Sequence, residues 1–402
     1  MKEFKRIESL EIVRGIALMF ILFFHSSIYN FANIHKIDFS NPPILIVLMS
    51  FMALWGGIFV IYSATVNSFM LISRSADKVE SKVFLITSIS ACFYILIHYL
   101  LTLFLGRWNI DFVNNMPNLT FVAEGFRHGR LALPDARHLF EGSSISTIAV
   151  NLLLMSWLLY FALKLKVAFK RICFYLCLGG LLVIILSVAR VTLYPRFTDA
   201  IAENNYFLSI LYSFFLANPY PVLTYFAYGL FGTLLGVLIY NDRRDIMKFA
   251  LLPLSALLFA YGVFGMMNFD KTISKPDYFW YFKTNFELGF FIFSITLIYL
   301  IFENRKKFLS KLSLIRNFSR ISLTVYMLEV TLSEIFRIVV SKLIPGWNQT
   351  INNSLLFGLF NVIVWSLIVT LWAKANFKFS FEYFWVKLQK KLGKESTKLG
   401  RV

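Results

Sequence analysis

The fold is decided by apolar stretches such as LEIVRGIALMFILFFHSS, which occupies residues 10–27. A helix needs about 20 mostly apolar residues to cross the hydrocarbon core of a bilayer. Because these stretches are continuously apolar and do not alternate with period two, they predict helices and exclude the strands of a membrane barrel. We therefore expect an all-α, polytopic membrane bundle of about ten transmembrane helices. The predicted spans are 10–32, 44–72, 83–106, 145–163, 172–193, 221–240, 249–268, 284–303, 321–343 and 355–375.

The composition supports a membrane protein and excludes a nucleic-acid-binding one. Hydrophobic residues make up 58% of the 402 residues and charged residues 15%, and the mean hydropathy is +0.67. A soluble domain carries about a quarter charged residues. The net charge of +18 comes from short basic runs between apolar segments, not from one basic face. Membrane lipids are therefore the expected surroundings, and no nucleic acid is expected as a partner.

The Lys and Arg counts of the connections orient the bundle. The terminal segments and alternate connections at 1–9, 74–82, 164–171, 241–248, 305–320 and 374–402 hold 27 Lys and Arg, whereas the other connections hold 10. Cytoplasmic loops of membrane proteins carry the excess of basic residues. We predict a multi-pass protein of the cell membrane with both termini in the cytoplasm and the loops 107–143 and 344–354 outside.

Two segments are expected to lie outside the regular spans. The apolar stretch 206–218 is short and precedes Pro219, which predicts a re-entrant or interfacial piece. Residues 377–402 form a basic cytoplasmic tail, expected to begin as an amphipathic segment on anionic lipid and to end disordered. The remaining 1–376 form the membrane domain.

The first span holds two ionisable side chains, Arg14 and His25, which are eleven residues apart. Such groups are costly inside a membrane and mark functional sites. Eleven residues come within roughly 20° of three full turns and cover about 16–17 Å, so both side chains lie on one helix face. An Arg near the inner leaflet can bind phosphates, and a deeper His can act as a general base. Alternatively, the Arg only reaches the headgroups and the His only bonds a neighbour.

Four stretches share a known pattern. RGIALMFILFFH (14–25) has Arg, ten residues, then His; WGGIFVIYSATVNSFMLISR (55–74), NPYPVLTYFAYGLFGTLLG (218–236) and FSRISLTVYMLEV (318–330) follow in order. Together they resemble the transmembrane acyltransferase superfamily. The first is similar to its acyltransferase-3 branch; the heparan-glucosaminide N-acetyltransferase branch has a similar RGIAL but Asn in place of His25. This chain departs from the family in having Ala64 for a Gly and Glu329 for a frequent His.

The resemblance implies an acyltransferase that uses acyl-CoA, most simply acetyl-CoA, as co-substrate. It implies that Arg14 and Arg74 contact the CoA phosphates and that His25 carries out the chemistry. It adds His35 as a second catalytic candidate, since a further His follows the first span in the heparan branch at nearly this spacing. The expected acceptor is a glycan or lipid-linked sugar at the outer face.

The outer loop 107–143 is long for a helical bundle, and loops of this length are usually functional or disordered. Its aromatic and charged residues predict an ordered lid that binds a sugar or glycolipid headgroup, or else a solvated loop with salt bridges. The candidate acceptor-binding residues are Arg127, His128, Arg130, Arg137 and His138.

Other polar residues of the spans are expected to hold helices together. Glu329, Ser333 and Arg337 recur on one face of the ninth span, with Glu334 nearby, and predict a packing contact. Glu287 and His98 predict further interhelical bonds, with His98 also a candidate for a proton path. The three cysteines lie in apolar segments without His or carboxylate at ligand spacing, so we predict no metal site.

Two other functions stay open at this point. A lipid-linked oligosaccharide polymerase or ligase also has many spans and an Arg-rich outer loop, and a secondary transporter would line a permeation route with residues such as Arg14 and His25. The sequence also leaves open the acceptor, the acyl chain length and the choice between direct transfer and a covalent relay. It does not decide the oligomeric state either, for which a homodimer is one option.

Overall fold

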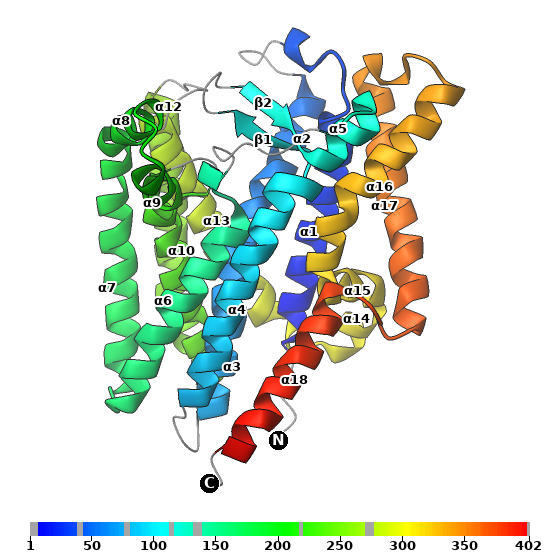
Figure 1. Cartoon of the computed structure of the whole chain (residues 1–402). Coiled ribbons are helices and arrows are strands. Elements are labelled where there is room, and N and C mark those ends of the chain that lie inside the picture. Colours follow the sequence, from blue (N-terminus) through cyan, green and yellow to red (C-terminus); the bar gives the residue numbers. More distant parts are fainter. Residues whose placement is uncertain are drawn as a thin grey trace.

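The computed structural model describes residues 7–37, 43–75, 81–111, 116–131, 139–216, 220–269 and 277–399. They form the predicted helical bundle (Figure 1). Nine described helices are long and apolar enough to cross a membrane, so the chain is a multi-pass helical membrane protein. They are α1 (Glu8–Ile28), α3 (Ile58–Ser75) with the turn before it, α4 (Ser81–Leu100) with the turn after it, α6 (Ser144–Lys164), α7 (Phe169–Ser187), α10 (Val222–Tyr240), α12 (Leu252–Asn268) with α11 (Arg244–Ile246), α13 (Tyr278–Phe302) and α17 (Ile351–Lys374).

The tenth predicted span is a long helix that carries charges. It is α16 (Ser322–Leu343), which contains Glu329, Glu334 and Arg337. In Figure 1, α1 begins and α17 ends at the same end of the bundle. That placement requires an even number of crossings, and α16 supplies the crossing that the nine apolar helices lack. The short helices α14 (Lys306–Lys311) and α15 (Ser313–Arg320) precede it.

The predicted single span 44–72 is wrong in its extent. The structure has a short helix, α2 (Ile44–Leu54), then a 3₁₀ turn at Trp55–Gly57, and the apolar crossing helix begins at Trp55. A Cβ on Gly56 would clash with the hydroxyl of Tyr220, and one on Gly57 would press on the ring of Phe291. The two glycines therefore permit a close approach of other elements at this turn. The predicted span 172–193 also overshoots, since α7 ends at Ser187.

The end of the bundle opposite to the start of α1 carries short elements (Figure 1). Two antiparallel strands, β1 (Trp108–Asp111) and β2 (Met116–Leu119), and the helix α5 (Phe121–His128) belong to the 107–143 loop, so its described part is ordered. The predicted short stretch 206–218 is α9 (Tyr206–Leu216), packed against α8 (Ala189–Ala202). Buried Arg190 of α8 donates from Nε to the carbonyl of Leu216 at 2.7 Å. A cation at a helix C-terminus is stabilising.

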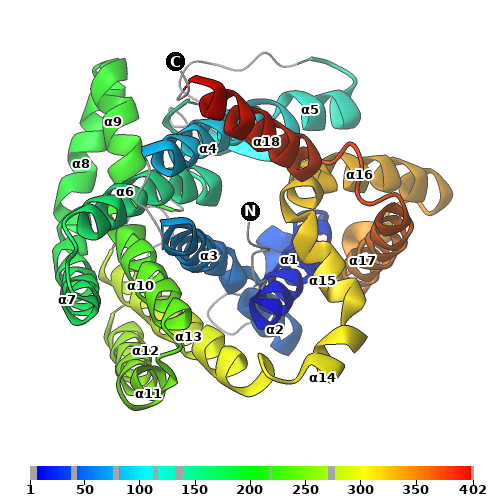
Figure 2. The same ribbon diagram turned by 90° about the horizontal axis from the view of Figure 1, so that it is seen from below.

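The centre of the bundle is built from α1, α3 and α10, and Figure 2 shows α1 and α3 in the interior with other helices around them. The apolar stretch of α10 is 89% buried inside the bundle, whereas that of α7 is only 22% buried. Gly232 and Gly236 of α10 let its backbone approach α3, because a Cβ on either would clash with the carbonyl of Ile61 or of Thr65. Small residues four apart are a common basis of close helix packing in membranes.

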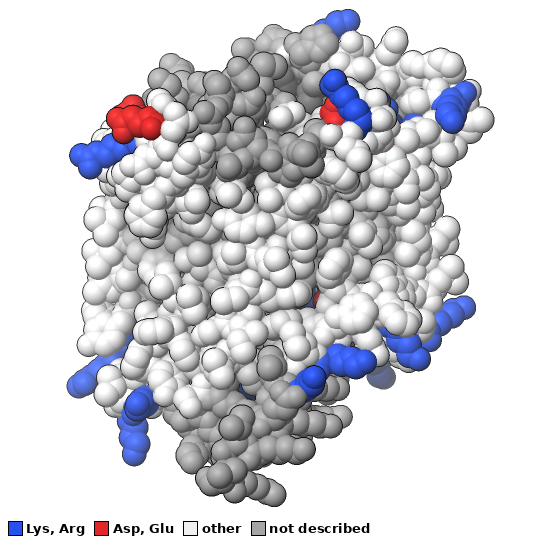
Figure 3. Space-filling view, in the orientation of Figure 1, with Lys and Arg blue, Asp and Glu red and all other residues white. Residues whose placement is uncertain are grey.

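The charges differ between the two ends. On the face drawn in Figure 3, Lys and Arg border the end at which α1 begins, whereas Lys, Arg and acidic residues all occur at the opposite end. This matches the uneven Lys and Arg counts of the connections.

The basic tail is more ordered than predicted. It forms α18 (Phe381–Leu399), which packs against α4 and α16. The ring of Trp385 stacks on the ring of Phe93, with ring centres 4.4 Å apart. The prediction of a disordered end is wrong as far as Leu399, because the apolar side of the tail packs on protein.

One tail residue, Glu382, caps α16. Its carboxylate accepts hydrogen bonds from the backbone N–H of Leu323 at 2.6 Å and of Thr324 at 3.2 Å, and from the Thr324 hydroxyl at 2.5 Å. The first N–H groups of a helix have no partner within the helix. A carboxylate supplied by a distant segment therefore satisfies them and also interacts well with the helix dipole.

We expect Glu382→Ala to lower the free energy of unfolding by about 1–3 kcal/mol, because it leaves these buried donors without an acceptor. The measurement is thermal unfolding of the purified protein in detergent. Lys387→Ala is the matched control, since Lys387 is an exposed residue of the same helix. Equal melting temperatures for the two variants would show that the cap is unimportant.

Candidate functional site

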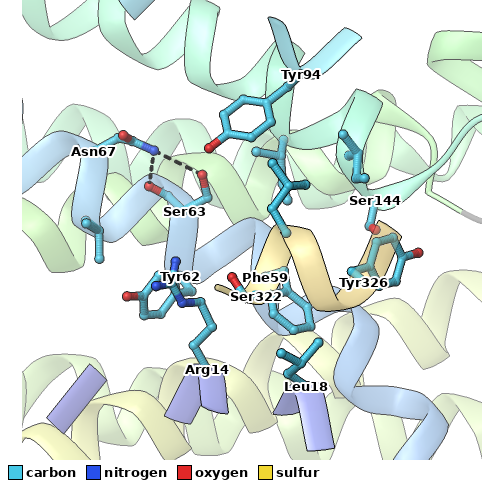
Figure 4. Close-up of a pocket in the computed structure, with 14 residues that line it drawn as sticks. Arg14, Leu18, Phe59, Tyr62, Ser63, Asn67, Tyr94, Ser144, Ser322 and Tyr326 are labelled. Carbon is cyan, nitrogen blue, oxygen red and sulfur yellow. Dashed lines mark hydrogen bonds between the residues drawn. The ribbon is translucent and has the colours of Figure 1, made fainter. Parts of the chain in front are cut away.

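A cavity of about 180 Å³ lies between α1, α3, α4, α6 and α16. Because it contains Arg14, near the start of α1, we name it the inner cavity after the predicted orientation of the chain. Figure 4 shows Arg14 of α1 at its edge, with Tyr62 of α3 beside the guanidinium. The residues that line it are Arg14, Leu18, Phe59, Tyr62, Ser63, Val66, Asn67, Tyr94, Ser144, Ile145, Ile148, Ser322, Leu323 and Tyr326. Most of its polar groups are hydroxyls, so Arg14 is the cation among the lining residues.

Arg14 is held in place without being neutralised. Its Nε donates to the hydroxyl of Ser319 at 2.9 Å, and its guanidinium lies 4.6 Å from the centre of the Tyr62 ring. Within the described residues, no carboxylate forms an ion pair with Arg14. A guanidinium that is partly buried and has no counter-ion is suited to bind an anion of a ligand.

The outer cavity is larger, at about 430 Å³, and contains His25. Its lining comes from α1, α3 with the turn before it, α13, α16, Tyr220 and the two ends of the outer loop. The polar and aromatic residues that line it are Phe24, His25, Tyr29, Phe59, Thr102, Arg107, Glu141, Ser143, Ser144, Tyr220, Trp280, Tyr326 and Glu329.

His25 is paired with a buried carboxylate. Its Nδ1 lies 2.5 Å from Oε1 of Glu329, and the side chain of Glu329 is 3% exposed against 23% for His25. The imidazole also stacks on the ring of Tyr29, with ring centres 5.0 Å apart. A carboxylate on one ring nitrogen fixes the orientation of an imidazole and stabilises its protonated form, while the other nitrogen is left for proton transfer. His25 and Glu329 thus have the arrangement of a general base and its orienting group.

The acidic and basic residues of the ninth predicted span hold elements together, as expected. Arg337 pairs with Glu334 at 2.6 Å within α16, and Glu334 also pairs with Arg107 and Arg127 of the outer loop. Glu329 pairs with His25 on α1. The expected interhelical role of Glu287 is confirmed, because it accepts from the hydroxyl of Tyr225 on α10 at 3.4 Å.

The two cavities adjoin each other. Phe59, Ser144 and Tyr326 line both. Arg14 and His25, predicted to share one face of the first helix, therefore face two adjoining cavities. Their separation along α1 is about 16–17 Å.

A buried ionic cluster lies beside the outer cavity. Glu334 is fully buried and forms ion pairs with Arg107 at 3.1 Å, Arg127 at 2.8 Å and Arg337 at 2.6 Å. Three guanidiniums around one carboxylate leave a local excess of positive charge. Burial lowers the pKa of Arg107 to about 10, and Glu334 acts in the opposite direction. Among the described lining residues, Arg107 is the cation of the outer cavity, and its Nε has no hydrogen-bond partner.

The acceptor-binding residues predicted in the outer loop do not line either cavity where the structure describes them. Arg127 belongs to the cluster around Glu334. Arg130 is 76% exposed and pairs with Glu124, and His128 lies 3.7 Å from the same carboxylate. Arg137 and His138 lie outside the described residues.

The two remaining predicted site residues lie apart from the cavities. Arg74 ends α3 two turns beyond Asn67, which lines the inner cavity, and so lies on the same helix face further toward the inner end. His35 lies in a 3₁₀ turn, Ile34–Lys36, and its side chain is outside the described part of the chain.

Three groups of the outer cavity were missed from the sequence: Arg107, Ser143 and Glu329 as the partner of His25. Arg107 directly follows a span and resembles any loop cation, so no local signal distinguishes it. In the described residues, no group of three or more His, Cys, Asp or Glu side chains is arranged to hold a metal ion.

Comparison with known proteins does not assign this chain to a family: no protein-family model and no curated protein sequence matches it.

Proposed function

We propose that the protein is a membrane acyltransferase that moves an acyl group, most simply acetyl, from cytoplasmic acyl-CoA to a glycan or lipid-linked sugar at the outer face. One observation carries the proposal: a guanidinium without an ion pair among the described residues and a carboxylate-oriented imidazole face two adjoining cavities along one helix. The family resemblance of the first helix points the same way.

The dimensions of the cavities suit an elongated donor. The inner cavity of about 180 Å³ accommodates a narrow chain such as a pantetheine arm. Arg14 would bind a phosphate or another anionic group of the donor, and Arg74, further toward the inner end, would face the nucleotide. The outer cavity of about 430 Å³ has room for the thioester and an acceptor group together.

His25 would act as the general base in the simplest form of the reaction. The acceptor hydroxyl gives its proton to His25, its oxygen forms a bond to the acyl carbon, and the carbon–sulfur bond breaks. The CoA thiolate then takes up the proton and leaves as the free thiol. Glu329 stabilises the imidazolium that forms between these steps.

The uneven basic charge supports placing the Arg14 end in the cytoplasm, since cytoplasmic connections carry the excess of Lys and Arg. The His25 end then faces outward, next to the 107–143 loop. Arg107, whose Nε is free of partners in the described structure, would contact an electronegative group of the acceptor or the oxyanion that forms during transfer.

The test uses the full-length protein in liposomes, with acetyl-CoA labelled in the acetyl group and a membrane glycolipid extract as acceptor. We expect labelled glycolipid, identified by mass spectrometry, with protein-dependent release of free CoA. Saturable uptake of a solute without CoA release would instead indicate a transporter. Growth of the glycan chains without CoA would indicate a polymerase or ligase, and either result would contradict the proposal.

A further inference from the structure

A serine that is paired with a second histidine lines the outer cavity. Ser143 lines this cavity together with His25 and Glu329. Its hydroxyl oxygen lies 2.7 Å from Nδ1 of His98 on α4. A serine hydroxyl at hydrogen-bond distance from an imidazole that is itself oriented by a third group is the arrangement of an activated nucleophile.

The orientation of His98 suits a base. His98 is 1% exposed, and the backbone of Glu141 interacts with its ring. In the tautomer that carries the ring proton on Nε2, Nδ1 accepts the proton of Ser143. Because His98 does not line the cavity, it acts on a substrate only through Ser143.

Ser143 also occupies the N-cap of α6. Its hydroxyl accepts from the backbone N–H of Ser146 at 3.3 Å, and the Ser146 hydroxyl accepts from the backbone N–H of Ser143 at 3.0 Å. This reciprocal cap explains both serines as structural residues. It does not require an imidazole on Ser143, nor does it require Ser143 to line a cavity that contains a second, carboxylate-bound imidazole. Those two features point to chemistry.

We propose that Ser143 carries the acyl group transiently, so that transfer proceeds through an acyl-serine. The inference rests on the proposed acyltransferase function and makes the reaction a covalent relay. His98 is the base for loading Ser143, and His25 is the base for the acceptor.

The loading step balances as follows. The Ser143 hydroxyl gives its proton to Nδ1 of His98, its oxygen bonds to the acyl carbon, and the carbon–sulfur bond breaks. His98 keeps this proton, and the CoA thiolate leaves the cavity and takes up a proton from water. Loading needs no redox partner and no further co-reactant.

The unloading step uses the other pair. The acceptor hydroxyl gives its proton to His25, its oxygen bonds to the acyl carbon, and the bond from that carbon to the Ser143 oxygen breaks. The alkoxide of Ser143 takes its proton back from His98, and His25 releases the acceptor's proton to water, which offsets the proton that the CoA thiolate took up. The products are the acylated acceptor and the free serine.

The test is to incubate the full-length protein with labelled acetyl-CoA without acceptor, quench it in acid and search its peptides by mass spectrometry. We expect an acetyl group on Ser143 in the wild type. Ser143→Asn keeps a good N-cap but lacks the nucleophile, so we expect a folded variant with no acetyl-serine. Because His98 then has no hydroxyl to activate, transfer should be slower by at least the contribution of one positioned base, about 10²–10⁴-fold. Ser146→Ala, which alters the cap but not the cavity lining, is the control and should still be acetylated.

The two histidines are expected to behave differently. His98→Gln should slow acetylation of Ser143 by about 10²–10⁴-fold, whereas His25→Gln should let acetyl-serine accumulate even with acceptor present. Transfer at the wild-type rate in Ser143→Asn would overturn the relay and leave the acyltransferase function intact. Absence of any acetyl transfer or CoA release in the wild type would overturn both.

Discussion

Replacing His25 by Gln is expected to lower the rate of acyl transfer to the acceptor by about 10²–10⁴-fold, the usual contribution of a positioned general base. The reason is that His25 is the imidazole that lines the outer cavity, with its Nδ1 held by Glu329. Gln is chosen because its amide can still donate to Glu329. Ala would leave a buried carboxylate without a partner and would confuse loss of catalysis with loss of stability.

The measurement is the rate of labelled product formation at saturating acetyl-CoA, with the affinity for CoA measured separately. The affinity should stay near the wild-type value, because Arg14 and the inner cavity are untouched. Glu287→Gln is the matched control, since it removes a buried charge from α13 that lines neither described cavity. A wild-type rate in His25→Gln would eliminate His25 as the base.

The second large effect is expected at the donor end. Arg14→Ala should weaken CoA binding by about 10–100-fold, because a hydrogen bond to a charged group contributes roughly 1.5–3 kcal/mol. Arg14→Lys should lie in between, since Lys keeps the charge but lacks the planar fork that holds phosphate oxygens. The measurement is equilibrium binding of CoA to the protein in nanodiscs.

The control for Arg14 is Arg305→Ala, which removes an exposed cation between α13 and α14. It should change the CoA affinity by less than about twofold, as expected for a charge in solvent. If both variants weakened binding equally, the attraction would come from the overall positive charge and not from a site at Arg14. Equal affinity in Arg14→Ala and the wild type would remove Arg14 from the donor site.

The errors in the predicted span 44–72 and in the predicted tail share one cause, because both features depend on contacts between residues far apart in the sequence. Hydropathy does not register the break at Trp55–Gly57, because the break depends on the approach of Tyr220 and Phe291 to two glycines. The disordered end predicted for the tail failed because Trp385 and Glu382 have partners on α4 and α16, which composition does not reveal.

The sequence alone determined the helical bundle, the positions of most spans and the common face of Arg14 and His25, because hydropathy and the helical repeat act over neighbouring residues. Only the tertiary structure decided which groups meet across helices. Glu329 reaches His25 from 304 residues away, Glu334 gathers three arginines, and His98 meets Ser143. Such pairs depend on how the helices pack against one another, and the neighbouring residues in the sequence do not indicate that packing.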